Sequence, residues 1–216
     1  MPNSSNMRTG GRILVDQLKI HNVDTAFCVP GESYLAALDA LHDTPEIRLL
    51  TCRHEANAAN MAEAYGKLTG RPGICFVTRG PGACHAVVGL HTAFQDSSPL
   101  VLFVGQVGRE MMEREAFQEM DFRRFFGQVS KWSAEIQDPG RIPELVSQAF
   151  HVATSGRPGP VVLSLPEDML RELSGVGDAK AYRGVQAHPG PDDMAQLREM
   201  LAAAKRPVMM LGGGTW

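Results

Sequence analysis

The sequence has little that would suit a membrane protein, a nucleic-acid-binding protein or a secreted one. Among its 216 residues no apolar run approaches the roughly 20 needed to span a bilayer, and the polar start, Met1–Arg8, lacks the apolar segment of a signal peptide. There is no basic cluster, since 21 Lys and Arg stand against 24 Asp and Glu, for a formal net charge of -3. We therefore expect a cytoplasmic protein that binds neither membranes nor nucleic acid.

The sequence also lacks the usual patterns of zinc sites and disulfide frameworks. The four cysteines, Cys28, Cys52, Cys75 and Cys84, form no CxxC or CxxH pattern. Three of them lie in or beside apolar runs, so buried reduced thiols are expected rather than disulfides or metal ligands. The seven histidines form no i, i+4 pair of the kind that binds zinc on a helix. We therefore predict no metal site in this chain.

Short apolar runs alternate with helical patterns, and Gly/Pro turns separate them. Helices are expected near residues 10–22, 33–41, 53–70, 83–95 and 142–154, with Ser33 as the cap of the second. Buried strands are expected near residues 25–29, 47–52, 74–78, 100–104, 129–136 and 160–165. Such an alternation predicts an α/β fold, with a doubly wound, mostly parallel six-stranded sheet and helices on both faces.

Three segments follow from this pattern. Residues 1–170 should form the first domain, in which residues 105–128 read as an irregular loop with short helical pieces. Residues 171–191, rich in Gly, Pro, Asp and Glu, read as a linker. Residues 192–216 predict a helix and then a strand from Pro207, the truncated start of a second α/β domain. Because one helix and one strand cannot bury a core, we expect the chain to be a fragment of a longer protein.

Glu55 occupies a notable position in this pattern. It follows an apolar strand and begins an alanine-rich helical stretch that stops at Gly70. The carboxyl ends of strands in parallel α/β sheets are where ligands bind. Small residues after Glu55 would let another surface approach this carboxylate closely. Glu55 is therefore the first candidate for a functional residue.

Other distinctive groups also stand at strand ends. Pro30-Gly31 follows the first strand, Gly80-Pro81-Gly82 follows the third, Gln106 follows the fourth, and an Ala-Phe-Gln-Glu segment contains Gln118. Each alone would be a plain turn or a solvated loop. In this order and spacing, together with Glu55, they resemble the N-terminal, pyrimidine-binding domain of thiamine-diphosphate-dependent enzymes, especially the acetolactate synthase large-subunit group. The resemblance covers roughly residues 10–170.

The resemblance implies particular roles for these residues. Glu55 would be catalytic, because its carboxyl group would hydrogen-bond a ring nitrogen of the cofactor's aminopyrimidine and so activate the cofactor. Such a group has to keep or share a proton near neutral pH. Gln118 would reach toward the reacting centre and is the second implied catalytic residue. The implied cofactor-binding residues are Pro30, Gly31, Glu55, Gly80, Pro81, Gly82 and His85.

The resemblance also implies the cofactors, with some departures from the family pattern. The cofactors would be thiamine diphosphate and Mg²⁺, but the family's Gly-Asp-Gly and downstream Asn, which hold the diphosphate and the metal in its C-terminal domain, are absent here. His85 stands where the family has Asn. Gly127 stands four residues before Lys131, where flavin-binding synthases have Arg, and this weakens the case for bound FAD. The site in the family forms between subunits, so a homodimer or homotetramer is expected.

The implied activity is decarboxylation of a 2-oxo acid, joining of the resulting carbanion to a carbonyl, or both. A related alternative is a thiamine-diphosphate decarboxylase or lyase that acts on an oxalyl or benzoyl compound. A nucleotide-binding module is a third reading, but its Gly-x-Gly-x-x-Gly after the first strand is missing. The chain, without the diphosphate and metal residues, is not expected to be active alone.

Overall fold

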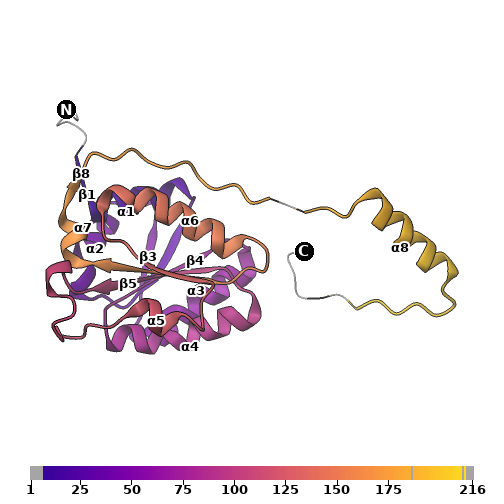
Figure 1. Ribbon diagram of the computed structural model, residues 1–216, viewed down its shortest axis with the longest axis horizontal. Helices are drawn as coiled ribbons and strands as arrows, with labels where there is room; N and C mark the ends of the chain where they lie inside the picture. The colour runs from indigo at the N-terminus through magenta and orange to yellow at the C-terminus, as the bar shows by residue number, and fades with distance from the viewer. Residues whose placement is uncertain (1–6, 186, 211, 213–216) are drawn as a thin grey trace. The chain divides into compact units, whose positions relative to one another are not determined.

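The computed structural model describes residues 7–185, 187–210 and 212 (Figure 1). The chain divides into two compact units, residues 1–183 and residues 184–216. The second unit contains helix α8 (Pro191–Ala203), none of whose residues is buried. Within the described part of the chain, no helix is both long enough and apolar enough to cross a membrane.

The first unit is built around a six-stranded sheet in which all neighbouring strands are parallel, in the order β3-β2-β4-β5-β7-β6. The strands are β2 (Thr25–Cys28), β3 (Arg48–Thr51), β4 (Gly73–Val77), β5 (Leu100–Gln106), β6 (Trp132–Glu135) and β7 (Pro160–Pro166). Every residue of β4, β5 and β7 is buried, as expected of parallel strands covered on both faces. The predicted α/β class and the doubly wound parallel sheet are confirmed.

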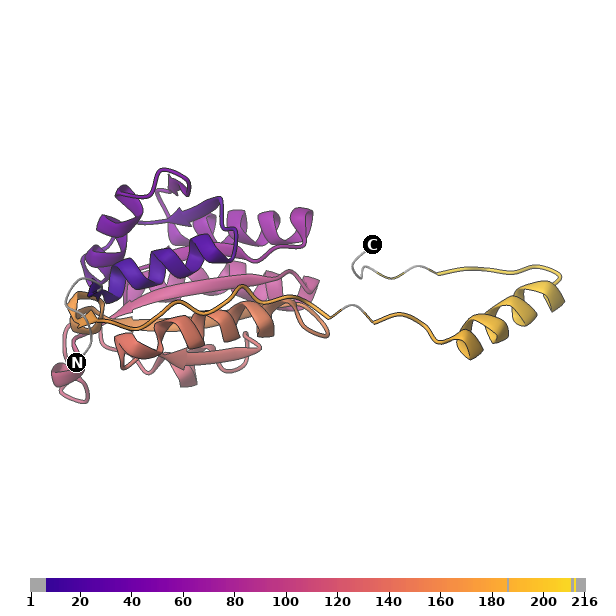
Figure 2. The same ribbon diagram turned by 90° about the horizontal axis from the view of Figure 1, so that it is seen from above.

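Helices cover both faces of this sheet and form two hydrophobic cores. The helices of the first unit are α1 (Gly10–Ile20), α2 (Leu35–His42), α3 (Glu55–Thr69), α4 (Pro81–Asp96), α5 (Phe122–Phe126), α6 (Ile142–Thr154) and α7 (Glu167–Arg171). Buried residues of α1, α2, α6 and α7 belong to one core, and those of α3, α4 and α5 belong to the other. Figure 1 shows the two helical layers above and below the sheet, and Figure 2 looks onto the layer that contains α1 and α6.

Two local predictions were wrong. The strand before Glu55 was expected to be buried, but β3 has exposed residues at both ends, Arg48 and Thr51, because it is an edge strand with one neighbour. Ser33 does not cap α2. It lies within a short 3-10 helix, η2 (Glu32–Tyr34), is fully buried, and hydrogen-bonds the hydroxyl group of Thr78 at 2.8 Å.

Other features were missed or differ from expectation. A two-stranded antiparallel ribbon joins β1 (Arg8–Thr9) to β8 (Leu173–Ser174). The expected strand from Pro207 is not formed over residues 207–210, while residues 211 and 213–216 lie outside the described residues. All four cysteines are free, as expected. Cys28 and Cys75 are buried, whereas Cys52 is only partly buried and Cys84 is exposed on α4. The loop after β5 is irregular as predicted, with a short 3-10 helix, η3 (Arg109–Met111), before α5.

Candidate active site

The sheet topology brings the predicted site residues to one place. From β2 the chain passes through α2 to β3, on one side of β2, whereas from β4 it passes through α4 to β5, on the other side. The connections after β2 and β4 therefore run in opposite directions, and open α/β sheets bind ligands at such a switch point. Gly31 follows β2 and Gly80 follows β4. The two predicted turns consequently flank the switch point.

Glu55 is the first residue of α3. The helix begins there because Nδ1 of His54 accepts a hydrogen bond from the backbone N–H of Ala56 at 3.1 Å, which caps the helix. The helix ends at Gly70, which adopts the left-handed conformation with φ of 69°. An acidic side chain in the first turn is favourable because the helix dipole is positive at this end. The local sequence thus fixes Glu55 at the carboxyl end of the sheet, as predicted.

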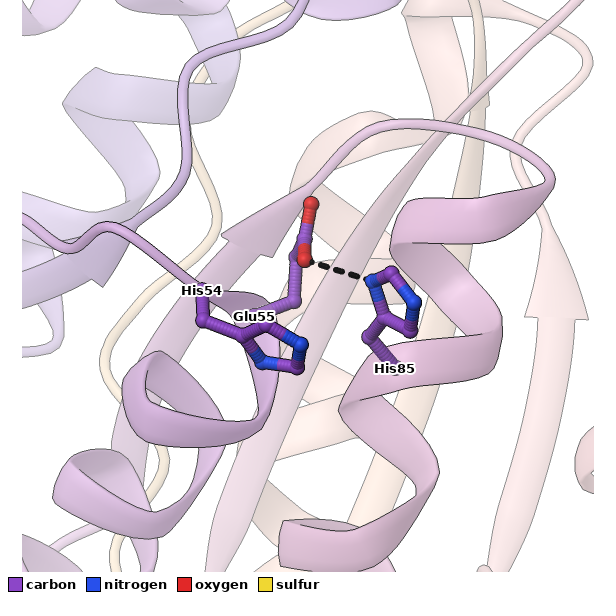
Figure 3. Close-up of side chains that lie close together, drawn as sticks. All are labelled: His54, Glu55 and His85. Atoms are coloured by element: carbon purple, nitrogen blue, oxygen red, sulfur yellow. Dashed lines mark hydrogen bonds and ion pairs between the residues drawn. The ribbon is translucent and has the colours of Figure 1, made fainter.

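The carboxylate of Glu55 has one engaged oxygen and one free oxygen. Oε2 lies 2.9 Å from Nδ1 of His85, which comes from the second turn of α4 (Figure 3). Oε1 makes no hydrogen bond within the described residues, and it lies 3.4 Å from the place that a Cβ atom on Gly82 would take. The side chain of Glu55 is 13% exposed, whereas that of His85 is 50% exposed. Glu55 is therefore mostly sheltered but keeps one oxygen for a ligand.

Close packing of α3 against α4 makes this contact possible. A Cβ atom on Gly89 of α4 would lie only 2.5 Å from the Cβ atom of Ala59 on α3. Real Cβ atoms do not approach so closely, so a glycine is required for the two helices to meet at this distance. The first turns of both helices are thereby held side by side, and Glu55 meets His85 between them.

Thr78 joins the two glycine turns and was not found from the sequence. A Cβ atom on Gly31 would lie 2.5 Å from Cβ of Thr78, and one on Gly82 would lie 2.8 Å from its Cγ2. The hydroxyl groups of Ser33 and Thr78 are 2.8 Å apart. At both positions a Cβ atom would clash with Thr78, so glycine is needed there, and Thr78 packs against both turns. Its position directly after β4 was the one available signal.

Gln118 is held against the turn after β4. Its backbone is left-handed, with φ of 64°, and its Cβ atom lies 2.7 Å from the place of a Cβ atom on Gly80. Gly80 itself has φ of 59° and ψ of −116°, a conformation that side chains disfavour. No hydrogen bond joins Gln118 to Glu55 in the described part of the chain. The structure thus brings Gln118 to the predicted turn without a direct link to the carboxylate.

The remaining predicted residues lie at the surface or make contacts within the chain. Pro30 and Pro81 are exposed, and Pro81 is the first residue of α4, where its fixed φ favours the start of a helix. Gln106 is only 3% exposed; its Nε2 donates to the carbonyl oxygen of Met120 at 2.8 Å, and its Oε1 accepts from the N–H of Val107 at 3.0 Å. Gln106 therefore anchors the loop that contains Gln118.

Lys131 has a structural role in this chain. Its Nζ donates to the carbonyl oxygens of Val152 and Ser155, at the end of α6, and the second of these bonds is 2.7 Å long. Burial lowers the pKa of the Lys131 ammonium group. The amino group thus closes the carboxyl end of a helix, where a cation also meets the negative end of the dipole.

A group of possible metal ligands also lies at this site. One ligand atom each from His54, Glu55 and His85 lies within 4.8 Å of the others. The rings of His54 and His85 are stacked, with centroids 4.6 Å apart. The sequence does not reveal this cluster through histidines at i, i+4 spacing on one helix, because its members come from two different helices.

Comparisons with known proteins agree with this architecture. Residues 8–125 match the family described as "Thiamine pyrophosphate enzyme, N-terminal TPP binding domain". The acetolactate synthase large subunit of Corynebacterium glutamicum is 37% identical over 211 residues, which cover 95% of this chain and 34% of that protein. The mitochondrial acetolactate synthase catalytic subunit of Saccharomyces cerevisiae is 39% identical over 217 residues, which cover 95% of this chain and 32% of that protein.

This chain spans about a third of the length of the curated relatives that it matches. The matched family segment includes β2, β3 and β4 with the turns that follow them, and therefore the surroundings of Glu55. The sheet, the placement of Glu55 and the sequence similarity lead to one assignment: this chain belongs to the thiamine pyrophosphate enzymes and contains their N-terminal TPP-binding domain.

Proposed function

We propose that this chain supplies the cofactor-activating half of the active site in an acetolactate synthase-like enzyme. The enzyme would decarboxylate a 2-oxo acid, join the resulting carbanion to a carbonyl, or both. The observation that supports this proposal best is the environment of Glu55, at the first residue of α3, with Oε1 free beside Gly82. Gly31 and Gly82 pack directly on Thr78, where a Cβ atom would not fit, and this packing fixes the two turns that would contact the cofactor ring.

Thiamine diphosphate, when bound, supplies a thiazolium carbon that attacks the carbonyl of the substrate. Glu55 would hold a proton at Oε1 and share it with a ring nitrogen of the aminopyrimidine. His85 would keep the carboxyl group oriented through its contact with Oε2. Gly31, Gly80, Pro81 and Gly82 would bind the ring from the two turns, and Gln118 would lie near the reacting groups.

The remaining contacts are proposed to come from outside this chain. Mg²⁺ and the diphosphate would be held by residues that are not present here, so the chain alone should bind thiamine diphosphate weakly and should not be active. Nζ of Lys131 is hydrogen-bonded to backbone carbonyl groups at the end of α6. This contact supports leaving FAD out of the proposed cofactors. A homodimer or homotetramer in the cytoplasm is proposed as the working form.

The test is the substitution Glu55→Gln in the full-length protein. This change keeps the size of the side chain and removes the acid, so turnover and exchange of the thiazolium C2 proton should fall about a hundredfold to ten-thousandfold. Glu46→Gln is the matched control, because Glu46 is an exposed carboxylate outside the site. Wild-type C2 exchange in Glu55→Gln would show that Glu55 only stabilises the helix dipole.

A further inference from the structure

The N-terminal ends of α3 and α4 bring together three side chains of the types that bind transition metals. His54 and Glu55 are adjacent at the start of α3, and His85 projects from α4 beside them (Figure 3). One ligand atom of each lies within 4.8 Å of the other two, and Nδ1 of His85 is already 2.9 Å from Oε2 of Glu55. Two imidazoles and one carboxylate, with a fourth position left to water, form a common zinc site in proteins.

We propose that His54, Glu55 and His85 form a binding site for a zinc-like divalent transition-metal ion. Both histidines are exposed, so an ion reaches them without opening the fold. A zinc site holds its ligand atoms at about 2.0–2.2 Å from the ion, so binding would draw these three atoms closer together than they lie now. The site is independent of the proposed Mg²⁺ site, which would lie outside this chain.

The donor set determines which ions fit. Mg²⁺ and Ca²⁺ prefer several oxygen ligands, and this cluster offers a single carboxylate. Imidazole nitrogens suit zinc, cobalt, nickel and copper. The positive ends of the dipoles of α3 and α4 lie at this site and oppose the binding of any cation. This repulsion further weakens the binding of ions, such as Mg²⁺ and Ca²⁺, that the donor set already holds poorly. The negative charge of the Glu55 carboxylate, beside the two stacked rings, offsets this effect for an ion that both histidines hold.

Binding would change the role of His54. In the structure, Nδ1 of His54 accepts a hydrogen bond from the backbone N–H of Ala56, so Nε2 is the atom available to bind a metal. An imidazole that binds a metal through Nε2 has its proton on Nδ1 and no longer accepts there. The N–H of Ala56 would therefore lose its acceptor when the metal binds. Hydrogen exchange at this one amide reports whether His54 is a ligand.

The site also overlaps the proposed cofactor site. The metal would occupy the carboxylate that Glu55 needs for its acid role, so a bound ion would inhibit the activation of the cofactor. This inhibition rests on the proposed function, whereas metal binding does not. Titration of the metal-free chain with Zn²⁺ alone, without thiamine diphosphate, therefore tests the site even if Glu55 has no catalytic role.

The experiment is calorimetric titration of the chain with Zn²⁺ and with Mg²⁺, supported by the visible absorption of bound Co²⁺. The wild-type chain should bind one Zn²⁺ and no Mg²⁺ at this site. His85→Asn and Glu55→Gln should each weaken Zn²⁺ binding at least tenfold. His91→Asn, which changes an exposed histidine elsewhere on α4, and Cys84→Ser, which removes the nearest exposed thiol in sequence, should leave the affinity unchanged.

Several results would overturn the proposal. One is wild-type affinity in His85→Asn with its fold intact by circular dichroism; its half-exposed position makes a folded variant expected. Another is a loss of binding in Cys84→Ser, because the thiol would then be a ligand in place of this donor set. Unchanged exchange of the Ala56 amide in the presence of Zn²⁺ would remove His54 from the site and leave too few ligands.

Discussion

Arg79 donates a hydrogen bond from Nε to the carbonyl oxygen of Phe117 at 3.1 Å, and this bond ties the turn after β4 to the loop that contains Gln118. The other guanidinium nitrogens contact Glu32 at 3.1 Å and Glu167 at 3.3 Å. The side chain of Arg79 is only 9% exposed. One sheltered cation thus connects the segments after β2, β4, β5 and β7, which surround the candidate site.

Arg79→Lys should loosen this connection. A lysine cannot make the forked contacts of a guanidinium group, so at least one of the three partners of Arg79 would be lost. We expect the free energy of unfolding to fall by about 1 to 3 kcal/mol, measured by urea denaturation. Hydrogen exchange should increase in residues 113–119. Arg141→Lys, in an exposed pair with Glu144, is the control and should change neither quantity measurably. Equal effects of the two substitutions would contradict the role given to Arg79.

Gly80→Ala should disturb Gln118 directly. The new Cβ atom would lie 2.7 Å from Cβ of Gln118, and the backbone has a positive φ with ψ of −116°. Gly70→Ala is the matched control, because Gly70 also has a positive φ but no atom within 4 Å of the new Cβ position. We expect Gly70→Ala to cost about 1 kcal/mol of unfolding free energy and Gly80→Ala at least about 2. Equal costs would show that the loop moves away freely.

The fold was largely predictable because its central strands are apolar along their whole length. Runs such as Leu100–Val104 can only be buried, and the Gly/Pro turns between runs fixed the alternation. Apolar runs do not indicate the order of the strands in the sheet. The sequence therefore did not predict that β3 lies at the edge and is partly exposed. The strands β1 and β8 have two residues each, too few to show any periodicity.

The candidate site was predictable only where it lies in continuous motifs. Glu55 and the turn at Gly80 stand out in the sequence, and their relative order supplied the resemblance. The role of Thr78 depends on how the turn after β2 meets the turn after β4, and the pairing of His54 with His85 depends on how α3 packs against α4. No local pattern encodes either contact. Ser33 is another example. Its position in the sequence predicted a helix cap, but its hydroxyl group instead hydrogen-bonds Thr78, 45 positions further along the chain.

The loop after β5 should loosen at low pH through Asp168. Its Oδ1 accepts from the N–H of Arg109 at 3.0 Å, and its Oδ2 accepts from Nε of Arg109 at 2.7 Å. Burial alone would raise the pKa of Asp168, but the hydrogen bonds from Arg109 outweigh it and hold the pKa below its usual value. The stabilisation is therefore present above the unfolded pKa of about 3.9 and is lost as the pH falls through the lower folded value.

The measurement is urea unfolding of the wild type and Asp168→Asn at several pH values. The wild type should be more stable at neutral pH, and the difference should shrink below about pH 4 as the wild-type carboxylate is protonated. Arg109→Met should remove most of the pH-dependent difference, as expected for two coupled residues. A constant difference at all pH values would show that the carboxylate does not titrate with folding.

The exposed surface of α3 and α4 should meet a second subunit in the full-length protein. Met61 on α3 is 42% exposed and Val88 on α4 is 58% exposed, on the two helices that carry Glu55 and His85 near their N-terminal ends. The hydroxyl group of Tyr65, also on α3, donates to Asp24 within the chain. A few side chains near the centre of an interface contribute most of its binding energy. A charge introduced there would be buried without a partner, which is unfavourable.

Met61→Glu and Val88→Glu should therefore each weaken the dimer at least tenfold, or about 1.4 kcal/mol, in sedimentation velocity experiments over a range of concentrations. Both side chains are already exposed, so neither substitution opens a cavity, and the melting temperature of the dissociated subunit should stay close to that of the wild type. Leu35→Glu is the control: it also replaces an exposed apolar residue, 53% exposed, but on α2, which packs on the opposite face of the sheet. If Leu35→Glu dissociates the subunits and the other two do not, the interface lies on the α2 face, and Glu55 does not face a partner.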